Sequence, residues 1–254
     1  MRIITLFNLK GGVAKTTTAI NLGAALAEKG KKCLLIDLDP QGDLSQSAGY
    51  GDLREDEITT YEVLKGENIN AGIKKGRYDI LPADTRLSAA DIELSNVTRR
   101  NYILKDSIKA LEADYDFIII DPQASLNIIT IMALTASTEV IIPVQAQYLP
   151  LKGVAYLRDT IDIVRARFNK ALEIGGILLT FYHSNYSLDK DVLEALEQAF
   201  GDKVFTTKIS NNTKLAEAPS HGKDIIAYSP KSNGAKQYRA LADEVIAHEA
   251  TERK

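Results

Sequence analysis

Cysteine is nearly absent from this sequence, and tryptophan is missing altogether. The single cysteine, Cys33, cannot form an internal disulfide, and its place in the apolar run 32–38 predicts a small buried side chain. One cysteine also excludes a cysteine-held iron–sulfur cluster or zinc centre. The three histidines, His183, His221 and His248, lie far apart and show no ligand spacing. We therefore expect none of these metal centres.

Long hydrophobic runs and a strong charge of either sign are absent as well. No apolar stretch approaches the roughly 20 residues of a membrane span. A strand-like run at residues 2–8 leaves no room for a signal peptide. We therefore expect a soluble, cytoplasmic protein that does not bind membranes. The net charge of −3 means that any contact with DNA must come from a local basic patch.

What the sequence does contain is a regular alternation of strand and helix patterns. Short apolar runs, typical of strands buried on both faces of a parallel sheet, occur at residues 3–7, 33–38, 117–120, 140–144 and 177–182. Helical patterns cover residues 16–29, 101–113, 126–137, 151–168, 189–200 and about 235–249, and a single short helix is expected near 60–65. The alternation predicts an α/β fold with a mostly parallel central sheet and helices on both faces. At 254 residues without a linker, we expect one domain, residues 1–254.

The strongest motif is LKGGVAKTTT at residues 9–18, between the first strand and the first helix. This is the context of a P-loop, in which backbone N–H groups at a helix N-terminus surround phosphate oxygens. Lys15 is expected to reach the β- and γ-phosphates, and Thr16 to offer its hydroxyl to Mg²⁺. The predicted cofactors are ATP or ADP with Mg²⁺. The loop residues expected to contact nucleotide are Lys10, Gly11, Gly12, Val13, Ala14, Lys15, Thr16 and Thr17.

Three carboxylates follow or end two further apolar runs. LLIDLDPQGDLS at residues 34–45 carries Asp37 and Asp39, and FIIIDPQASL at 117–126 carries Asp121. Alternate side chains of a strand point the same way, so Asp37 and Asp39 are expected on one face. One of them would serve the Mg²⁺ shell while the other orients a water for attack on the γ-phosphate. Asp121 is expected to bond a Mg²⁺-bound water. Thr16, Asp37 and Asp121 are thus the predicted metal-site residues.

These motifs together resemble those of the ParA/MinD superfamily of P-loop proteins. The lysine before the glycines, Lys10, matches the signature lysine of its deviant Walker A motif, and DPQG at 39–42 resembles its Walker A′ motif. Residues 117–126 look like a Walker B strand, and residues 215–245 look like the end of chromosomal and plasmid ParA proteins. The resemblance covers nearly the whole chain. It is to the short, Soj-like members, which have no N-terminal helix-turn-helix domain.

The resemblance implies an ATPase that dimerises on ATP binding and acts in plasmid or chromosome partition or in cargo positioning on DNA. It implies slow hydrolysis that a ParB-like partner stimulates, and association with the nucleoid if DNA is bound. By the same resemblance Lys10 contacts the phosphates of the partner subunit, and Asp39 positions the attacking water. Together with Lys15 these are the expected catalytic residues. The segment 208–212 would lie near the adenine, which makes Ile209 and Ser210 candidate nucleotide contacts.

The chain departs from the family pattern in two ways. Ala14 stands where the family commonly has glycine, and alanine costs about 1–2 kcal/mol if the position requires a positive φ. The family's I-P-R-N-x-R is ISNNTK at residues 209–214, and its R-T-N-L is NYSL at 185–188, so arginines that short ParA proteins use for DNA are missing. The remaining candidates for phosphate contacts are Lys214, Lys231, Lys236 and Arg239. The alternative is that these residues are a solvated face and the protein acts through another protein.

Two other functions are alternatives to a role in partition. A MinD-like membrane cycler needs a basic amphipathic C-terminal helix with bulky apolar residues, whereas the tail AHEATERK has two glutamates and no Phe, Leu or Trp. A metabolic P-loop ligase of the dethiobiotin synthetase kind lacks a lysine that acts on a second subunit, so Lys10 argues against it. Binding of an acid substrate would separate a metabolic enzyme from a switch.

Overall fold

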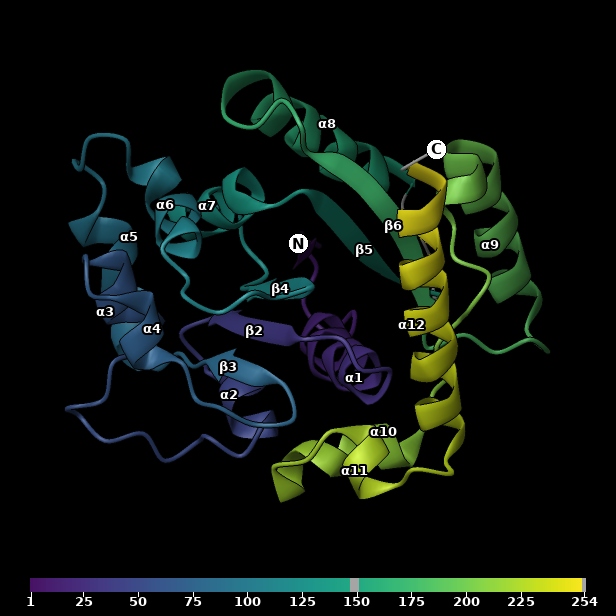
Figure 1. Cartoon of the computed structure of the whole chain (residues 1–254). Helices are drawn as coiled ribbons and strands as arrows, with labels where there is room; N and C mark the ends of the chain where they lie inside the picture. Colours follow the sequence, from purple (N-terminus) through teal and green to yellow (C-terminus); the bar gives the residue numbers. More distant parts are fainter. Residues whose placement is uncertain (147–150, 253–254) are drawn as a thin grey trace.

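The computed structural model describes residues 1–146 and 151–252 of the chain (Figure 1). Its centre is a six-stranded sheet in the order β3-β2-β4-β1-β5-β6, and every neighbouring pair of strands is parallel. The strands are β1 (Arg2–Leu6), β2 (Cys33–Leu38), β3 (Asp79–Leu81), β4 (Phe117–Pro122), β5 (Glu139–Gln145) and β6 (Glu173–Thr180). The predicted α/β fold with a parallel sheet is confirmed.

The central strands are apolar because both of their faces are covered. Every residue of β2 and of β4 is buried, including the aspartate that each strand carries near its end. The predicted run at 117–120 ended at Ile120, whereas β4 continues through Asp121 to Pro122. The short strand β3 was not predicted, because three residues are too few to show a periodic pattern.

Helices account for most of the remaining chain. They are α1 (Lys15–Glu28), α2 (Asp43–Ser47), α3 (Thr60–Leu64), α4 (Ile69–Gly72), α5 (Ala90–Glu93), α6 (Ile103–Lys109), α7 (Ile128–Ala136), α8 (Leu151–Arg167), α9 (Ser187–Phe200), α10 (Thr213–Glu217), α11 (Ile225–Tyr228) and α12 (Asn233–Glu252). Short 3₁₀ turns are η1 (Thr85–Ala89), η2 (Arg100–Tyr102), η3 (Gly201–Lys203) and η4 (Ala218–His221). The prediction of a single short helix within 49–76 was incomplete, because α4 follows α3 there. The pattern at 101–113 is divided between η2 and the shorter α6.

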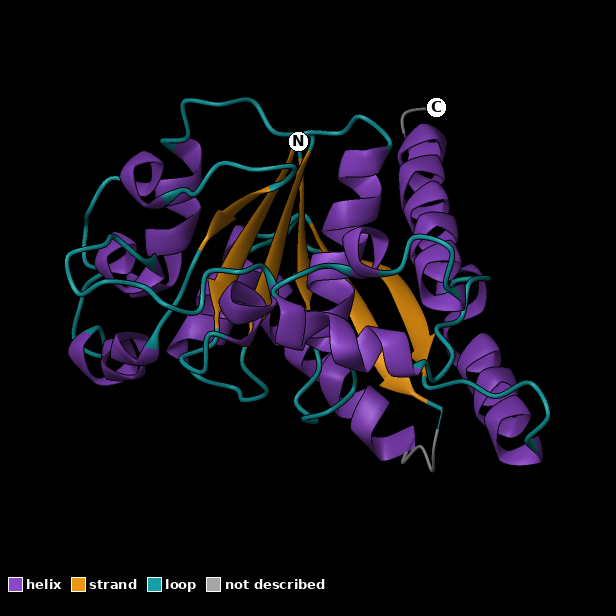
Figure 2. Ribbon diagram, turned by 90° about the horizontal axis from the view of Figure 1, so that it is seen from below, coloured by secondary structure: helices purple, strands orange, loops and turns teal. Residues whose placement is uncertain are grey.

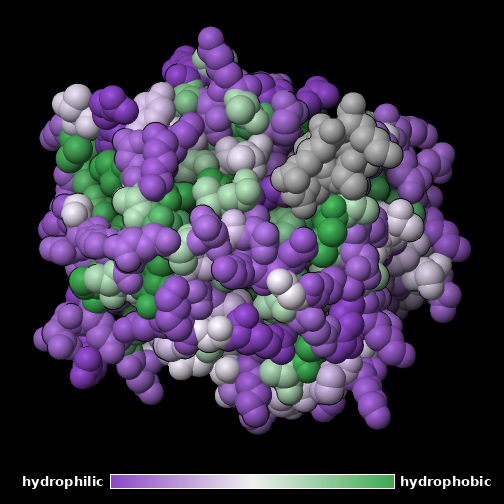
Figure 3. Space-filling view, viewed as in Figure 1, coloured by the Kyte–Doolittle hydropathy of each residue, from purple (hydrophilic) through white to green (hydrophobic). Residues whose placement is uncertain are grey.

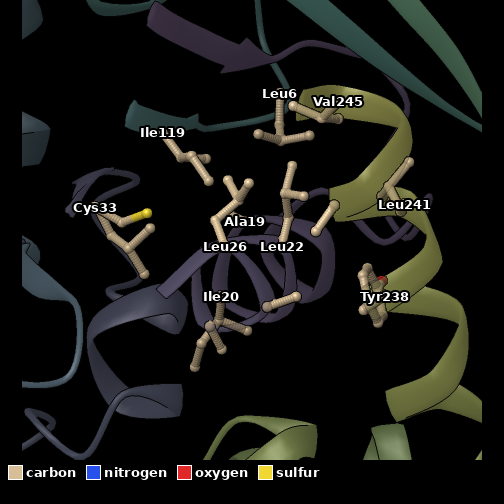
Figure 4. Close-up of a cluster of buried hydrophobic side chains, with 14 of the residues drawn as sticks. Leu6, Ala19, Ile20, Leu22, Leu26, Cys33, Ile119, Tyr238, Leu241 and Val245 are labelled. Atoms are coloured by element: carbon tan, nitrogen blue, oxygen red, sulfur yellow. The ribbon is translucent and has the colours of Figure 1, made fainter. Parts of the chain in front are cut away.

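Helices pack on both faces of the sheet, and their apolar sides form the core. On one face α1 lies against α12, and the cluster between them and the sheet includes Leu22, Leu26 and Leu241 (Figure 4). Cys33 belongs to this cluster, and burial raises the pKa of its thiol to about 12. The expectation of a small, buried side chain at Cys33 is confirmed. The other face packs against α3, α6 and α7.

The surface is mostly polar. The face in Figure 3 is largely hydrophilic, with smaller hydrophobic areas between charged side chains. Within residues 1–146 and 151–252, no helix combines the length and the apolar character that crossing a bilayer requires.

Candidate functional site

The three predicted motifs meet at one edge of the sheet. Strands β2, β4 and β1 are consecutive parallel neighbours, so their carboxyl ends lie side by side (Figure 2). This is the edge at which open α/β sheets bind ligands. The P-loop leaves β1 there, the DPQG turn leaves β2, and Asp121 ends β4. The fold therefore brings the predicted phosphate and metal residues together.

The P-loop turns sharply into α1 through two left-handed residues. Gly12 has φ 72°, and Ala14 has φ 67° and ψ 35°. Ala14 thus has the positive φ that costs an L-residue about 1–2 kcal/mol. The carbonyl of Ala14 accepts the first helical hydrogen bond, from Thr18 N at 2.9 Å. The turn leaves the N–H groups that begin α1 free for an anion, as a phosphate site requires.

Asn8 fixes the start of the loop, and the sequence patterns did not single it out. Its amide donates to the carbonyl of Pro143 on β5 at 2.8 Å, and its Oδ1 accepts from the N–H of Lys10 at 2.9 Å. The side chain of Lys10 is exposed, and its Nζ lies 3.4 Å from Oε1 of Gln145. Lys10 therefore extends outward along the end of β5.

Lys15, by contrast, is buried. Its side chain is 8% exposed, and burial lowers the pKa of its ammonium, while the carboxylates of Asp121 and Asp39 act in the opposite direction. Two lysines five residues apart in one loop thus have opposite environments. Lys15 faces the acidic residues of its own site, whereas Lys10 faces solvent.

Asp37 and Asp121 are both buried, but only Asp37 has hydrogen-bond partners. Oδ2 of Asp37 accepts from Ser45 N at 2.9 Å and from Ser45 Oγ at 2.6 Å, and its Oδ1 accepts from Asp39 N at 3.1 Å. Burial raises the pKa of Asp37 to about 6, and the Ser45 hydrogen bonds oppose that shift. Both oxygens of Asp121 are buried and accept no hydrogen bond from residues 1–146 or 151–252. Its pKa is raised by burial first and by the Asp37 carboxylate second.

Asp39 lies in the turn that follows β2 and is partly exposed. Its Oδ1 accepts from Gln41 N at 2.9 Å, and its carbonyl accepts from Gly42 N at 3.0 Å. Asp37 lies on the strand, as expected, but β2 ends at Leu38 and Asp39 lies beyond it. The two aspartates therefore do not share a strand face. The side chain of Asp39 stays within electrostatic reach of Lys15.

These residues fit a magnesium ion. Mg²⁺ is octahedral, prefers oxygen ligands and keeps several waters in sites that also hold phosphates. Asp121 supplies buried carboxylate oxygens with no other partner, and the Thr16 side chain is close enough to lower the pKa of Asp121. In the described part of the chain, no three His, Cys, Asp or Glu side chains are grouped so that they could hold a metal ion by themselves. The site thus suits an ion held largely by phosphate and water.

A pocket with about 450 Å³ of empty space, part of it open to solvent, lies beside the P-loop. Its walls include Ala14 and Thr17 from the loop, Phe181 after β6, and the predicted contacts Ile209 and Ser210. Phe181 has φ 54°, which is rare for a bulky residue. The segment that contains Ile209 is held beside β6 by two backbone hydrogen bonds, from Ile209 N to Leu179 O and from Tyr182 N to Ile209 O. The size and position of the cavity suit a nucleotide base.

The four candidate DNA contacts are not equivalent. Lys214 pairs with Glu217 at 2.7 Å, and Arg239 makes two bonds to the Glu28 carboxylate, at 2.6 and 2.9 Å. Lys231 and Lys236 are exposed. Half of the predicted set is therefore already neutralised within the chain.

Comparisons with known proteins identify the family of the chain. The model of the AAA domain family AAA_31 matches residues 1–174. The chromosome partitioning protein ParA of Caulobacter vibrioides is 42% identical over 98% of this chain and 95% of its own length. The sporulation initiation inhibitor protein Soj of Bacillus subtilis is 41% identical over 97% of this chain and 99% of its own.

A solved structure with the same fold carries a different name. It is the cobyrinic acid a,c-diamide synthase of Mycobacterium smegmatis with bound ATP analog and magnesium, 35% identical, with a TM-score of 0.87 over 100% of this chain and 98% of that one. The partitioning relatives are more similar in sequence over almost the same length. With a P-loop, a Walker A′ turn and a Walker B strand at one sheet edge, this chain belongs to the ParA/Soj family of partitioning P-loop ATPases.

Proposed function

We propose that the protein is a switch that dimerises around ATP, with Lys10 of each subunit reaching the nucleotide of the other. The carrying observation is the opposite placement of the two P-loop lysines. Lys15 is buried beside Asp121, whereas Lys10 is exposed, with its backbone N–H bonded to Asn8 and its side chain directed toward Gln145. A lysine directed away from its own metal site is available to the phosphates of a second subunit.

The remaining roles follow from chemistry and position. The cofactors are ATP or ADP and Mg²⁺, as in the relative whose structure holds an ATP analog with magnesium. Lys15 and the N–H groups of the loop bind the phosphates, and Thr16 with Asp121 serves the Mg²⁺ shell. Asp37 was predicted beside them, but its hydrogen bonds support a different role, which is to hold the turn that carries Asp39. Asp39 then positions the attacking water.

Sedimentation of the protein with a slowly hydrolysed ATP analogue tests the dimer. The wild type is expected to dimerise with the analogue and to remain monomeric with ADP. Lys10→Ala is expected to reduce dimerisation while nucleotide affinity is kept, and Lys15→Ala to reduce the affinity itself. Lys190→Ala, which removes an exposed lysine on α9, is the control. Normal dimerisation of Lys10→Ala would show that Lys10 has no role across the interface.

In this proposal the dimer binds DNA without sequence specificity, in the cytoplasm and on the nucleoid, and a ParB-like protein stimulates hydrolysis. Two observations support this: the chain belongs to the family, and Lys231 and Lys236 are exposed. A dimer would have twice the number of these exposed lysines. ATP would thereby control DNA binding, since each phosphate contact adds to a salt-sensitive affinity.

A metabolic role is the second candidate, and one observation favours it. The chain is similar over its whole length to a structure named as a synthase. The exposed Lys10 argues for the switch, because a ligase that works within one subunit has no use for it. Nucleotide-dependent dimerisation that needs Lys10 would separate the two.

A further inference from the structure

One polar residue of the pocket beside the P-loop, Ser210, is held in a fixed orientation by α12. Ser210 lines the cavity, and Gln237 on α12 accepts two hydrogen bonds from it at Oε1. One comes from the Ser210 backbone N–H and the other from its hydroxyl, both at 3.1 Å. Asn233, one turn earlier on α12, lies 3.0 Å from the same hydroxyl through its amide nitrogen.

This network determines which partners Ser210 can take. A backbone N–H only donates, so the Gln237 atom facing it must be the carboxamide oxygen. That oxygen only accepts, so the hydroxyl proton of Ser210 points to Gln237. The Asn233 amide group donates to the same hydroxyl. Ser210 Oγ has therefore used its proton and one lone pair, and what it can still offer a ligand is a lone pair.

Asn212 is oriented in the opposite sense. Its Oδ1 accepts from Lys214 N at 2.9 Å at the start of α10, so its amide hydrogens are the groups it can present to the cavity that it lines. Two other polar lining groups, the hydroxyls of Thr180 and Tyr238, already have partners. Thr180 Oγ1 donates to Val13 O at 3.2 Å, and the Tyr238 hydroxyl is 3.3 Å from Thr18 Oγ1.

We propose that Ser210, with its hydroxyl orientation set by Gln237, is the residue that makes the site select adenine over guanine. The Watson–Crick edge of adenine has an amino group, which donates, beside a ring nitrogen, which accepts. The acceptor of Ser210 and the donor of Asn212 match that pair. Guanine has a carbonyl oxygen and a protonated nitrogen at those positions, so both contacts would be mismatched. A mismatched buried polar pair discriminates more strongly than shape does.

Gln237 acts on the base only through Ser210, so it is a positioning residue. Ser210 is also a feature of this chain, because the family pattern has proline at its position, which has neither N–H nor hydroxyl. The inference rests on the ATPase assignment and adds the origin of its base selectivity.

Equilibrium binding of the slowly hydrolysed analogues of ATP, GTP and ITP tests the inference in the full-length protein. ITP is informative because it differs from ATP in the base edge alone. The wild type is expected to prefer ATP over both. Gln237→Met keeps the length of the side chain but removes the acceptor, and Ser210→Ala removes the hydroxyl. Each should reduce the preference for ATP by about tenfold, the effect of one buried polar mismatch.

Two further variants separate selectivity from structure. Gln237→Glu retains an acceptor for both Ser210 groups and is expected to retain the preference. Gln198→Met makes the same substitution on the exposed face of α9 and should change nothing. Ser210→Ala lies outside α12, so it gives a result even if Gln237→Met disturbs that helix. If Ser210→Ala and Gln237→Met each weakened the binding of all three nucleotides equally, this proposal would be overturned and the ATPase assignment would stand. A wild type that binds none of them would overturn the ATPase assignment with it.

Discussion

Asp37 and Asp121 lie directly opposite each other on the neighbouring strands β2 and β4, both buried, yet Asp37 has three hydrogen-bond donors and Asp121 has none. Two adjacent buried carboxylates raise each other's pKa, as the Asp37 charge does for Asp121. The donors around Asp37 offset part of this cost. For Asp121 the opposing contributions come from the Thr16 side chain and the Lys15 ammonium, and neither replaces the donors that Asp37 has, as expected for a carboxylate that binds a hydrated cation.

Asp121→Asn is therefore expected to weaken the use of Mg²⁺ more than it weakens the fold. The Mg²⁺ concentration for half-maximal ATPase activity should rise by roughly tenfold or more, as for other residues that orient metal-bound groups. Asp37→Asn is the matched control. Its amide hydrogens would face donors from Ser45 or Asp39, so it should lower the free energy of unfolding by about 1–3 kcal/mol. A reversed pattern, with Asp37→Asn shifting the Mg²⁺ titration, would restore Asp37 as the metal-site residue.

Asp39→Ala is expected to abolish hydrolysis while nucleotide binding stays close to normal. The phosphate contacts come from the P-loop, and within residues 1–146 and 151–252 the Asp39 side chain accepts only a local hydrogen bond, from Gln41 N. Dimer formed with ATP itself should therefore accumulate in size-exclusion chromatography. Turnover at the wild-type rate in this variant would remove Asp39 from the mechanism.

Ala14→Gly is expected to stabilise the protein in the absence of nucleotide. Relief of the left-handed alanine is worth about 1–2 kcal/mol, and the extra freedom of glycine in the unfolded chain costs about 0.4–1 kcal/mol. The net gain should be about 0.5–1 kcal/mol in urea denaturation. Ala27→Gly, within α1, is the control and should lose about 1 kcal/mol. Destabilisation by both substitutions would mean that the loop strain at Ala14 is negligible.

Lys231→Ala/Lys236→Ala is expected to reduce ATP-dependent retention of duplex DNA. Both lysines are exposed, whereas Lys214 and Arg239 are paired with Glu217 and Glu28. Loss of two phosphate contacts per subunit should reduce the salt dependence of binding by about 1.8 units in log–log slope for each subunit. Lys190→Ala serves as the control. Unchanged retention in the double variant would place any DNA surface elsewhere, and no retention by the wild type at low salt would remove DNA as a partner.

The sheet and the phosphate edge were predictable because their signals are local. Continuous apolar runs identified β1, β2 and β4, and glycine spacing identified the loop that follows β1. No local pattern marks β3, because this strand has only three residues and is defined by its pairing with β2.

Contacts between distant residues were the part that could not be predicted. Gln237 is 27 residues from Ser210, and Asn8 is 135 residues from Pro143. Neither polar residue stands out in a window of sequence, because its role exists only once the strands and α12 are assembled. The orientation of Asp37 toward Ser45 was also missed, although the two lie only eight residues apart. The turn between them is formed by Gly42, which has a positive φ, and this reverses the chain.

The hydrogen bonds from Gln237 and Asn233 to Ser210 also have a consequence for the order in which the parts of the nucleotide site are made during synthesis. Domains fold as they emerge from the N-terminal side at about 5–20 residues per second. The P-loop is among the first segments made, but the residues that orient Ser210 lie on α12, the last described helix. A nascent chain therefore contains its phosphate loop long before it contains the residues that orient Ser210. In this proposal the protein cannot select its base before that helix has been translated.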